Sequence, residues 1–279
     1  MTNKKPVQWL VITDLDGTLL NHHDYATDMA IPAIKKLQSL NIPIIFNTSK
    51  TFSESVSLQE KLNIQAPFIV ENGSCIYIPK NLYAGINLNK NYQTRDEYRE
   101  IVLGMTHVKI SDILNHIDTP DACYQLLSAC NAEEAASLTG LNLSQAKQAT
   151  SREFSEPLIW KAGKKELTLF KEQLKKHKLN TLQGGRFLHV LGNCDKGIAS
   201  NKLKEILSTP DIHIKTIILG DSENDAAMLK ESDISIIVNS PSNHQLLNTL
   251  IPTIHSTKDA PEGWAESIYM ALNILKDSQ

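Results

Sequence analysis

The stretch WLVITDLDGTLLNHH, residues 9–23, joins an apolar run to two carboxylates that stand one residue apart. The apolar run over 9–12 is typical of a buried β-strand. Because side chains alternate along an extended chain, Asp14 and Asp16 are expected on the same side, with Gly17 turning the chain away. Taken alone, the pattern fits either an ordinary acidic turn or a rigid mount for a charged reaction centre.

Composition and charge exclude several classes of protein. The chain has 279 residues, 41% of them hydrophobic, which is typical of a globular protein with one large or two modest domains. Its net charge of -3 provides no basic field to attract nucleic acid or an anionic membrane. The four cysteines form neither a CxxC pair nor a zinc-type cluster, and no apolar run reaches about 18 residues. We expect a cytoplasmic protein with no nucleic-acid or membrane partner, and the oligomeric state stays open.

Strand-like and helix-like segments alternate in the first third of the chain and again in the last third. Strands are expected over 9–15, 42–49, 67–78, 214–221 and 234–240, and helices over 30–41, 53–64, 197–208, 226–233 and 263–278. Strands that alternate with helices of about a dozen residues indicate βαβ units and a parallel sheet.

The middle of the chain has a different character. Polar, helix-like stretches at 96–105 and 131–141 are interleaved with candidate strands at 157–162 and 186–192. We therefore predict an α/β fold with a Rossmann-like parallel-sheet core over 1–83 and 193–279. An α+β domain over 84–192 is inserted into that core.

Polar groups follow three of the expected core strands. Asp14 and Asp16 end the first, Thr48 and Ser49 the second, and Asp221 a later one. Ligands of open α/β sheets bind outside the carboxyl ends of the strands, so these groups are expected to converge. Carboxylates that share a dry pocket repel one another unless a cation lies between them, and Mg²⁺ prefers such oxygen ligands.

This arrangement suits phosphoryl transfer. An aspartate is a competent nucleophile toward phosphorus, and water then hydrolyses the aspartyl-phosphate. Mg²⁺ offsets the repulsion between the carboxylate and the phosphoryl group. Thr48 and nearby N–H groups are suited to hold phosphoryl oxygens, and Lys196, just before an expected helix, is the candidate for the balancing positive charge.

Four motifs now stand in order: DLDGTLL at 14–20, NTSKT at 47–51, CDKG at 194–197 and GDSENDAAML at 220–229. They resemble the four motifs of the haloacid dehalogenase-like phosphatases, and the long insertion resembles the type-two cap of that superfamily.

The resemblance implies a role for each matching position. Asp14 would be the nucleophile and a metal ligand. Asp16 would be the general acid and base and would offer its backbone carbonyl to the metal. Thr48 and Lys196 would hold the phosphoryl group. Asp221 would complete the metal site, and Asn224 and Asp225 would support that site from the following turn.

Further segments narrow the resemblance. NTSKT, VENG (70–73), REFSEPLIW (152–160), GGRFLHVLG (184–192) and PEGW (261–264) are similar to mannosyl-3-phosphoglycerate phosphatases. That family hydrolyses a small phosphorylated sugar-glycerate to mannosylglycerate and phosphate in compatible-solute metabolism. The candidate substrate-binding residues are Ser49, Lys50, Asn72, Arg152, Arg186 and His189.

Several of these residues have simpler interpretations. Strand alternation places Arg186 and His189 on opposite faces, so both reach one pocket only if the strand is twisted, bulged or at an edge. Arg152 is as well suited to a salt bridge with Glu153 or Glu156. Thr48-Ser49 is also a candidate helix N-cap, and Asn72-Gly73 a simple turn.

Rival functions stay open at this point. The substrate could be glucosyl-3-phosphoglycerate or another sugar phosphate, and a phosphomutase would use the same nucleophile. A non-catalytic phosphosugar-binding protein on the same scaffold is the alternative from a different class. Oxygen ligands accept Mn²⁺ as well as Mg²⁺.

Overall fold

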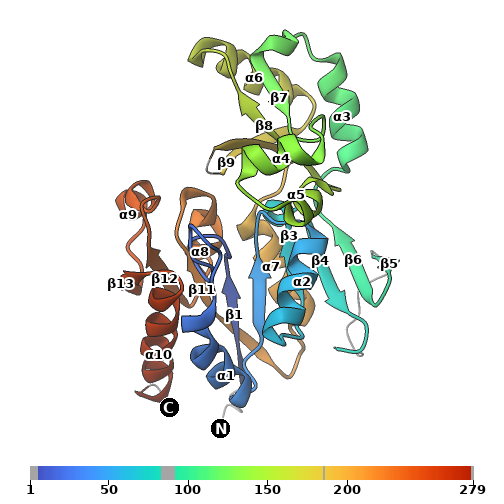
Figure 1. Cartoon of the computed structure of the whole chain (residues 1–279). Coiled ribbons are helices and arrows are strands. Elements are labelled where there is room, and N and C mark those ends of the chain that lie inside the picture. The colour runs from blue at the N-terminus through green and yellow to red at the C-terminus, as the bar shows by residue number, and fades with distance from the viewer. Residues whose placement is uncertain (1–5, 83–91, 185, 278–279) are drawn as a thin grey trace.

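A computed structural model of the chain describes residues 6–82, 92–184 and 186–277. Within these residues it contains a nine-stranded sheet and a four-stranded sheet. Figure 1 shows the four-stranded sheet and its helices stacked on one end of the larger domain, with both chain ends at the opposite end. The predicted α/β fold with an inserted α+β cap is confirmed. Across the described ranges, no helix combines the length and the apolarity needed to cross a membrane.

The large sheet has a parallel centre. Its strand order is β13-β12-β11-β1-β2-β3-β4-β6-β5. The parallel strands are β1 (Val7–Thr13), β2 (Ile44–Asn47), β3 (Phe68–Val70), β11 (His213–Gly220), β12 (Ile234–Asn239) and β13 (Ile254–Asp259). β1 lies between β11 and β2, and its second half is buried on both faces. This burial explains why the sequence of β1 over 9–12 is an unbroken apolar run and does not alternate with polar residues.

Helices cover the two faces of this sheet. They are α1 (Ile31–Ser39), α2 (Phe52–Leu62), α7 (Lys196–Leu207), α8 (Ala226–Lys230), α9 (His244–Thr249) and α10 (Glu262–Asp277), with single 3-10 turns at Asp28–Ala30, Glu71–Gly73 and Glu223–Asp225. Two of the helices begin at side-chain caps beside the strand ends. Thr51 forms a capping box with Glu54 at the start of α2, and Asp195 accepts the N–H of Ile198 at the start of α7. The caps therefore fix where these helices begin relative to the sheet.

The cap domain is built on the smaller antiparallel sheet, in the order β7-β8-β10-β9. Its elements are α3 (His107–His116), a 3-10 turn (Asp121–Cys123), β7 (Tyr124–Leu126), α4 (Ala132–Thr139), α5 (Leu143–Thr150), β8 (Ser155–Trp160), α6 (Lys164–Lys176), β9 (Leu179–Gly184) and β10 (Phe187–Gly192). Apolar side chains of α3 and α6 pack on this sheet in a core of their own, which includes Ile110, Phe170 and Val190. The cap thus has its own hydrophobic core.

The start of the insertion differs from the sequence-based boundary. The predicted junction between residues 83 and 84 lies outside the described residues. After it, β5 (Gln93–Arg95) and β6 (Tyr98–Val102) still belong to the core sheet, where β6 pairs antiparallel with β4 (Cys75–Pro79). The helix predicted over 96–105 is therefore wrong. Local helical spacing was overridden by pairing with β4, in which the buried Glu100 accepts the Tyr77 hydroxyl at 2.7 Å.

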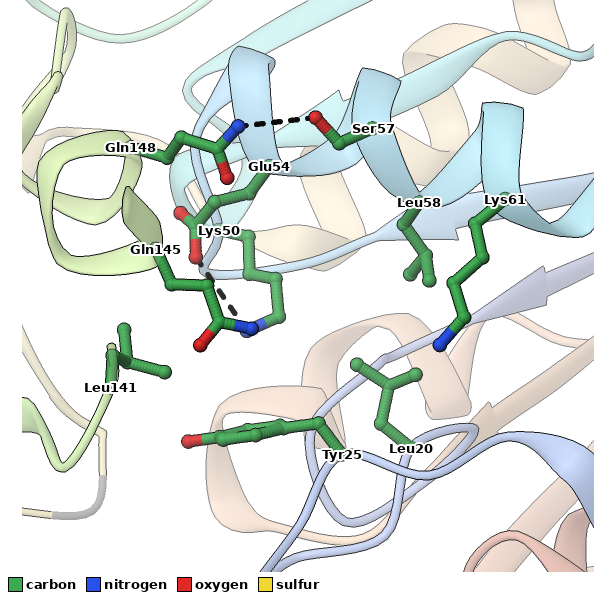
Figure 2. A pocket seen from close by; sticks show the side chains of 10 residues that line it. All are labelled: Leu20, Tyr25, Lys50, Glu54, Ser57, Leu58, Lys61, Leu141, Gln145 and Gln148. Carbon is green, nitrogen blue, oxygen red and sulfur yellow. Dashed lines mark hydrogen bonds and ion pairs between the residues drawn. The ribbon is translucent and has the colours of Figure 1, made fainter. Parts of the chain in front are cut away.

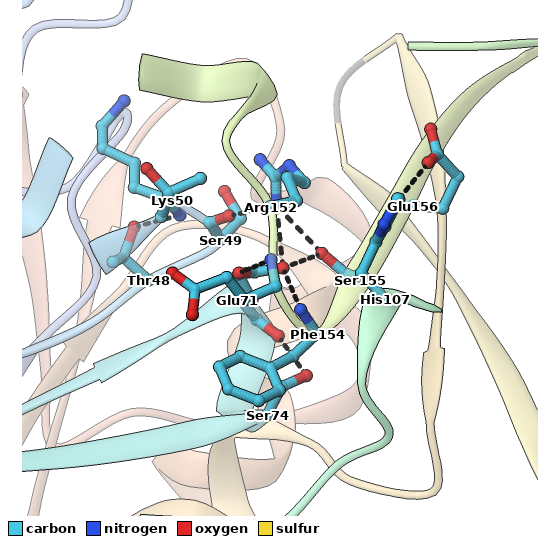
Figure 3. Close-up of polar contacts among 12 residues, drawn as sticks. Thr48, Ser49, Lys50, Glu71, Ser74, His107, Arg152, Phe154, Ser155 and Glu156 are labelled. Atoms are coloured by element: carbon cyan, nitrogen blue, oxygen red, sulfur yellow. Dashed lines mark hydrogen bonds and ion pairs between the residues drawn. The ribbon is translucent and has the colours of Figure 1, made fainter. Parts of the chain in front are cut away.

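Residues 151–155, which follow α5 within the cap and lead into β8, are here called the cap linker, and they are bonded to the core at Glu71. This buried residue has φ 49, in the left-handed region that non-glycine residues seldom adopt. Its carboxylate accepts the N–H group of Glu153 at 2.9 Å. It also accepts the N–H group of Phe154 (3.2 Å) and the hydroxyl of Ser155 (2.5 Å), both labelled in Figure 3. Its own N–H donates to the Lys50 carbonyl at 3.0 Å. Glu71 therefore ties the cap linker to the loop that follows β2.

Replacing Glu71 should destabilise the protein strongly. Glu71→Ala leaves buried donors of residues 153–155 without an acceptor, and each such group costs about 1–3 kcal/mol. We expect at least about 2 kcal/mol of lost stability, measured by scanning calorimetry. Glu153→Ala is the matched control, because its ion pair with Arg95 is partly exposed and contributes at most about 1 kcal/mol. Equal losses in the two variants would contradict this role of Glu71.

Candidate active site

Polar side chains from three parallel strands meet at one edge of the large sheet. Asp14 follows β1, Thr48 follows β2, and Asp221 follows β11. All three are buried, with exposed fractions of 5%, 1% and 2%. Because β11, β1 and β2 are adjacent and parallel, their carboxyl ends open on the same side of the sheet. The convergence of these three strand ends follows from that topology.

A fully buried ammonium group lies between two of the carboxylates. Lys196 Nζ donates to Asp14 Oδ1 at 2.5 Å and to Asp225 Oδ1 at 2.6 Å. Burial opposes the charge of Lys196, but the carboxylates of Asp14 and Asp225 outweigh it and raise the pKa of this lysine. Lys196 is the first residue of α7, so the Asp195 cap that begins the helix also sets where the ammonium lies.

Negative charge is in excess at this site. Carboxylate oxygens of Asp14, Asp221 and Asp225 lie within 4.8 Å of one another. Burial is the main cause that raises the pKa of Asp14 to about 7, and burial together with Asp225 raises that of Asp221. Three carboxylates and one ammonium leave two uncompensated negative charges when all are ionised. The donor set therefore fits a divalent cation with oxygen ligands.

Asp225 contacts Lys196 directly, whereas the family resemblance implied only a supporting role for it beside the metal site. Its Oδ1 contacts Lys196, while its Oδ2 accepts the N–H groups of Asp221 (3.0 Å) and Ser222 (3.1 Å). Both oxygens are thus engaged by the protein. Asn224, the other expected supporter, donates to Asn72 Oδ1 at 3.2 Å and so joins the turn after β11 to the turn after β3.

The side chain of Asp16 lies apart from the acidic cluster. It forms an ion pair with Lys50 at 2.9 Å, and about a third of it (36%) is exposed. A proton carrier for a leaving group needs such access. Gly17 has φ +80, and a Cβ there would come within 2.7 Å of Asp221 Oδ2, so only glycine lets the chain turn this close to Asp221.

The loop after β2 is held by hydrogen bonds on both sides. Thr48 Oγ1 accepts the N–H of Lys50 at 3.1 Å, and its carbonyl accepts the N–H of Asn72 at 2.9 Å. The alternative assignment of Thr48-Ser49 as the N-cap of the next helix is wrong, because Thr51 caps α2. Asn72 adopts φ 58 within a 3-10 turn, so the turn interpretation of Asn72-Gly73 holds for the backbone.

Arg152 reaches from the cap linker into this loop. Its Nη1 donates to the Ser49 carbonyl at 2.9 Å and to Ser155 Oγ at 3.1 Å, as Figure 3 shows. The alternative pairing with Glu153 or Glu156 is wrong, because those carboxylates pair with other residues. Arg152 Nε is buried and has no hydrogen-bond partner among the residues that the structure describes. A buried donor of this kind calls for a ligand or water.

His189 and Arg186 have opposite surroundings. His189 on β10 is buried, and its Nδ1 has no partner within the described parts of the chain. Burial, with the charges of Arg152 and Lys196, lowers the pKa of His189 to about 3, so the ring is neutral. Arg186 precedes β10, is exposed and donates to the Leu138 carbonyl at 2.7 Å. Because Arg186 lies in the turn before β10, the alternation of side chains along that strand does not apply to this pair.

Sequence reasoning missed Glu71. It lies in the VENG segment, in which Asn72 was the predicted substrate-binding residue. A carboxylate directly after an apolar strand run is the same pattern that identified Asp14, so the sequence did contain a usable indication. Its partners at 153–155 lie 82 to 84 residues further along the chain, and no spacing rule connects them.

Comparison with known sequences agrees with this geometry. A model of the haloacid dehalogenase-like hydrolase family matches residues 11–259. A Persephonella marina protein named glucosyl-3-phosphoglycerate/mannosyl-3-phosphoglycerate phosphatase is 35% identical over 269 residues, covering 96% of this chain and 98% of its own. A Methanococcoides burtonii protein of the same name is 34% identical over 262 residues, covering 93% and 95%.

Solved structures show the same fold. A Thermoplasma acidophilum protein superposes with a TM-score of 0.65 at 15% identity, covering 97% of this chain and 99% of its own. The sucrose-phosphatase of Synechocystis sp. PCC6803 gives 0.61 at 16% identity, covering 94% and 97%. The matched sequence, the acidic strand ends and the inserted cap lead to one conclusion: the chain belongs to the haloacid dehalogenase-like hydrolase family.

Proposed function

We propose that the protein is a phosphatase that hydrolyses mannosyl-3-phosphoglycerate to mannosylglycerate and phosphate. The observation that carries the proposal is the buried Asp14 carboxylate, held at a strand end by Lys196, in a chain one third identical to two phosphatases of that name. Those relatives' names include glucosyl-3-phosphoglycerate, which is therefore the first alternative substrate. A cytoplasmic role in compatible-solute metabolism belongs to the same proposal.

The first chemical step would use Asp14 as the nucleophile. One of its carboxylate oxygens bonds to Lys196, which holds the group in place and leaves the other oxygen to attack phosphorus. As the new O–P bond forms, the bond from phosphorus to the glycerate oxygen breaks. Asp16, which must carry a proton at this stage, donates it to that oxygen. The products of this step are the free alcohol and an aspartyl-phosphate at Asp14.

The second step regenerates the enzyme. Asp16, now ionised, accepts a proton from water, whose oxygen attacks phosphorus and displaces Asp14. Thr48 and Lys196 would hold the phosphoryl oxygens through both steps. Lys50, paired with Asp16 at 2.9 Å, would hold that side chain in place for both proton transfers.

A divalent cation, Mg²⁺ in our proposal, would be held by Asp14, Asp221 and the backbone carbonyl of Asp16. When bound, it would neutralise charge between the nucleophile and the phosphoryl group. Asp225 and Asn224 would support this set from the turn after β11. The excess of two negative charges described above supports the assignment, and Mn²⁺ would satisfy the same oxygen ligands.

Recognition of the glycerate would fall to the cap linker. Ser49, Lys50 and Asn72 border the phosphoryl site from the core side. Arg152 Nε is a buried donor, and a guanidinium is suited to a planar carboxylate. His189, neutral at physiological pH, would bond to an uncharged oxygen of the substrate. Arg186, which is exposed, would contribute less than Arg152.

The rival functions predict different results. To separate these functions, we would compare kcat/KM in the presence of Mg²⁺ on a panel of substrates. The panel contains glycosyl-3-phosphoglycerates, hexose phosphates and p-nitrophenyl phosphate. Highest kcat/KM on a glycosyl-3-phosphoglycerate supports the proposal, and a preference for hexose phosphates contradicts the substrate. Absence of phosphate release from every compound would favour a phosphosugar-binding protein.

Removing the nucleophile should abolish turnover. Asp14→Asn keeps the shape of the side chain but removes its negative charge, and we expect kcat to fall at least about a thousandfold. Wild-type protein quenched during turnover should contain a phosphorylated peptide that includes Asp14, detectable by mass spectrometry. Asp211→Asn, at an exposed position, is the matched control and should keep full activity. Equal activity of both variants would rule out Asp14.

Stabilisation by Mg²⁺ should depend on pH. The pKa of Asp14, raised from 3.8 to about 7 in the metal-free protein, means that folding favours its protonated form. Stability of the metal-free protein should therefore fall as pH rises between about 4 and 7. The cation must replace that proton, so the increase in Tm caused by Mg²⁺ should be larger at pH 8 than at pH 5.5. A shift independent of pH would contradict a cation site at Asp14.

The two cap arginines should differ in importance. Arg152→Lys removes the buried guanidinium donors, and we expect kcat/KM on mannosyl-3-phosphoglycerate to fall at least about tenfold, or ~1.4 kcal/mol. Arg186→Lys, the same substitution at an exposed position, should cost about threefold or less. A larger loss for Arg186→Lys would reverse the assignment of the carboxylate-binding residue.

A further inference from the structure

A cavity lies between the core and the cap, where it is lined by the loops that follow β1 and β2. Figure 2 shows side chains that enter it from α2, from the 20–25 loop and from the cap segment around α5. Its volume is about 180 Å³. The two walls are tied together, because Gln148 Nε2 donates to Ser57 Oγ at 3.2 Å and Thr51 Oγ1 donates to the Gln148 carbonyl at 3.1 Å. The cavity is thus a feature of the docked cap.

Lys50 connects this cavity to the reaction centre. Its side chain lines the cavity, and its Nζ lies 2.9 Å from Asp16 Oδ1. Asp16 is the proposed proton donor to the leaving oxygen, so the alcohol that departs must begin next to Asp16. A leaving group that extends from that point toward Lys50 enters this cavity.

Tyr25 lines the cavity and has an unusual backbone conformation. It has φ 57, and the loop is held by Asn21, whose side chain accepts the N–H of His23 and whose carbonyl accepts the N–H of Tyr25. Lys50 Nζ lies 4.9 Å from the centre of the Tyr25 ring. Residues held in sparsely populated conformations cluster at ligand sites, which is consistent with a binding role for this loop.

The lining chemistry fits one sugar ring. Amide, hydroxyl, carboxylate and ammonium groups alternate with apolar side chains, which suits a ligand with hydroxyls and C–H faces. The lining residues are Leu20, Tyr25, Lys50, Glu54, Ser57, Leu58, Lys61, Leu141, Gln145 and Gln148. The volume is below the roughly 300–1,000 Å³ of pockets that hold a whole small ligand. It therefore suits one part of a substrate whose remainder lies at the strand ends.

We infer that this cavity binds the glycosyl part of the leaving group, with Tyr25, Leu141 and Gln148 among its specificity-determining residues. This inference rests on the proposed phosphatase function and deepens it. Sugar hydroxyls would bond to the amide and ammonium groups, and the glycerate would span the distance to Asp16. Lys61 forms no ion pair with any residue the structure describes, so its ammonium remains available to a hydroxyl.

Filling the cavity tests the inference. Leu141→Trp places a large ring in it, whereas Leu143→Trp makes the same substitution two residues away at an exposed position outside the lining. The quantity to compare is the ratio of kcat/KM on mannosyl-3-phosphoglycerate to that on p-nitrophenyl phosphate. We expect this ratio to fall at least tenfold in Leu141→Trp and to stay within twofold of wild type in Leu143→Trp.

Product inhibition provides a second readout. Mannosylglycerate should inhibit wild-type hydrolysis of p-nitrophenyl phosphate competitively, with an inhibition constant raised at least tenfold in Leu141→Trp. If Leu141→Trp does not fold, Lys61→Met, an exposed substitution, should still lower the substrate ratio at least threefold. An unchanged ratio and unchanged inhibition overturn the cavity assignment. Failure of wild type to hydrolyse any phosphate ester would instead overturn the proposed function.

Discussion

The contact of Lys196 with Asp14 and Asp225 is the interaction on which the site depends. A fully buried ammonium is costly unless it is paired, and here it is bonded to two carboxylates at 2.5 and 2.6 Å. The same pair of bonds fixes Asp14 for its proposed role in attack on phosphorus. Among the residues that the structure describes, no positive side chain pairs with the third carboxylate, Asp221. A divalent cation beside it would complete the charge balance.

The sheet topology makes this contact possible. Asp14 and Lys196 are 182 residues apart in the chain, yet β1 lies next to β11 and α7 begins at the same edge of the sheet. Close approach of these segments also depends on residues without side chains. A Cβ on Gly73, which has φ +92, would collide with the Asp195 carbonyl at the start of α7. The turn after β3 therefore helps to place Lys196.

The cap is joined to this centre by the loop after β2. Glu71 donates its N–H to the Lys50 carbonyl and accepts the Ser155 hydroxyl, and Arg152 donates to the Ser49 carbonyl. The cap linker and the proposed phosphoryl-binding loop therefore form one hydrogen-bonded unit. Lys50 extends from the same loop to Asp16 and to the cavity under the cap. Groups proposed for chemistry and for substrate selection are therefore positioned by the same few residues.

The sequence by itself determined the parallel core, most of its strands and the strand-end residues Asp14, Thr48 and Asp221, because apolar runs and their polar ends are local patterns. It could not determine that 98–102 is a core strand, since pairing with β4 outweighed a helix-like spacing. Only the tertiary structure decided that Asp225 contacts Lys196 and that Glu71 binds the cap linker. It also decided that the side chain of Arg152 is only 9% exposed while Arg186 is exposed. Each of these depends on which distant segments meet, and residue spacing along the chain carries no record of that.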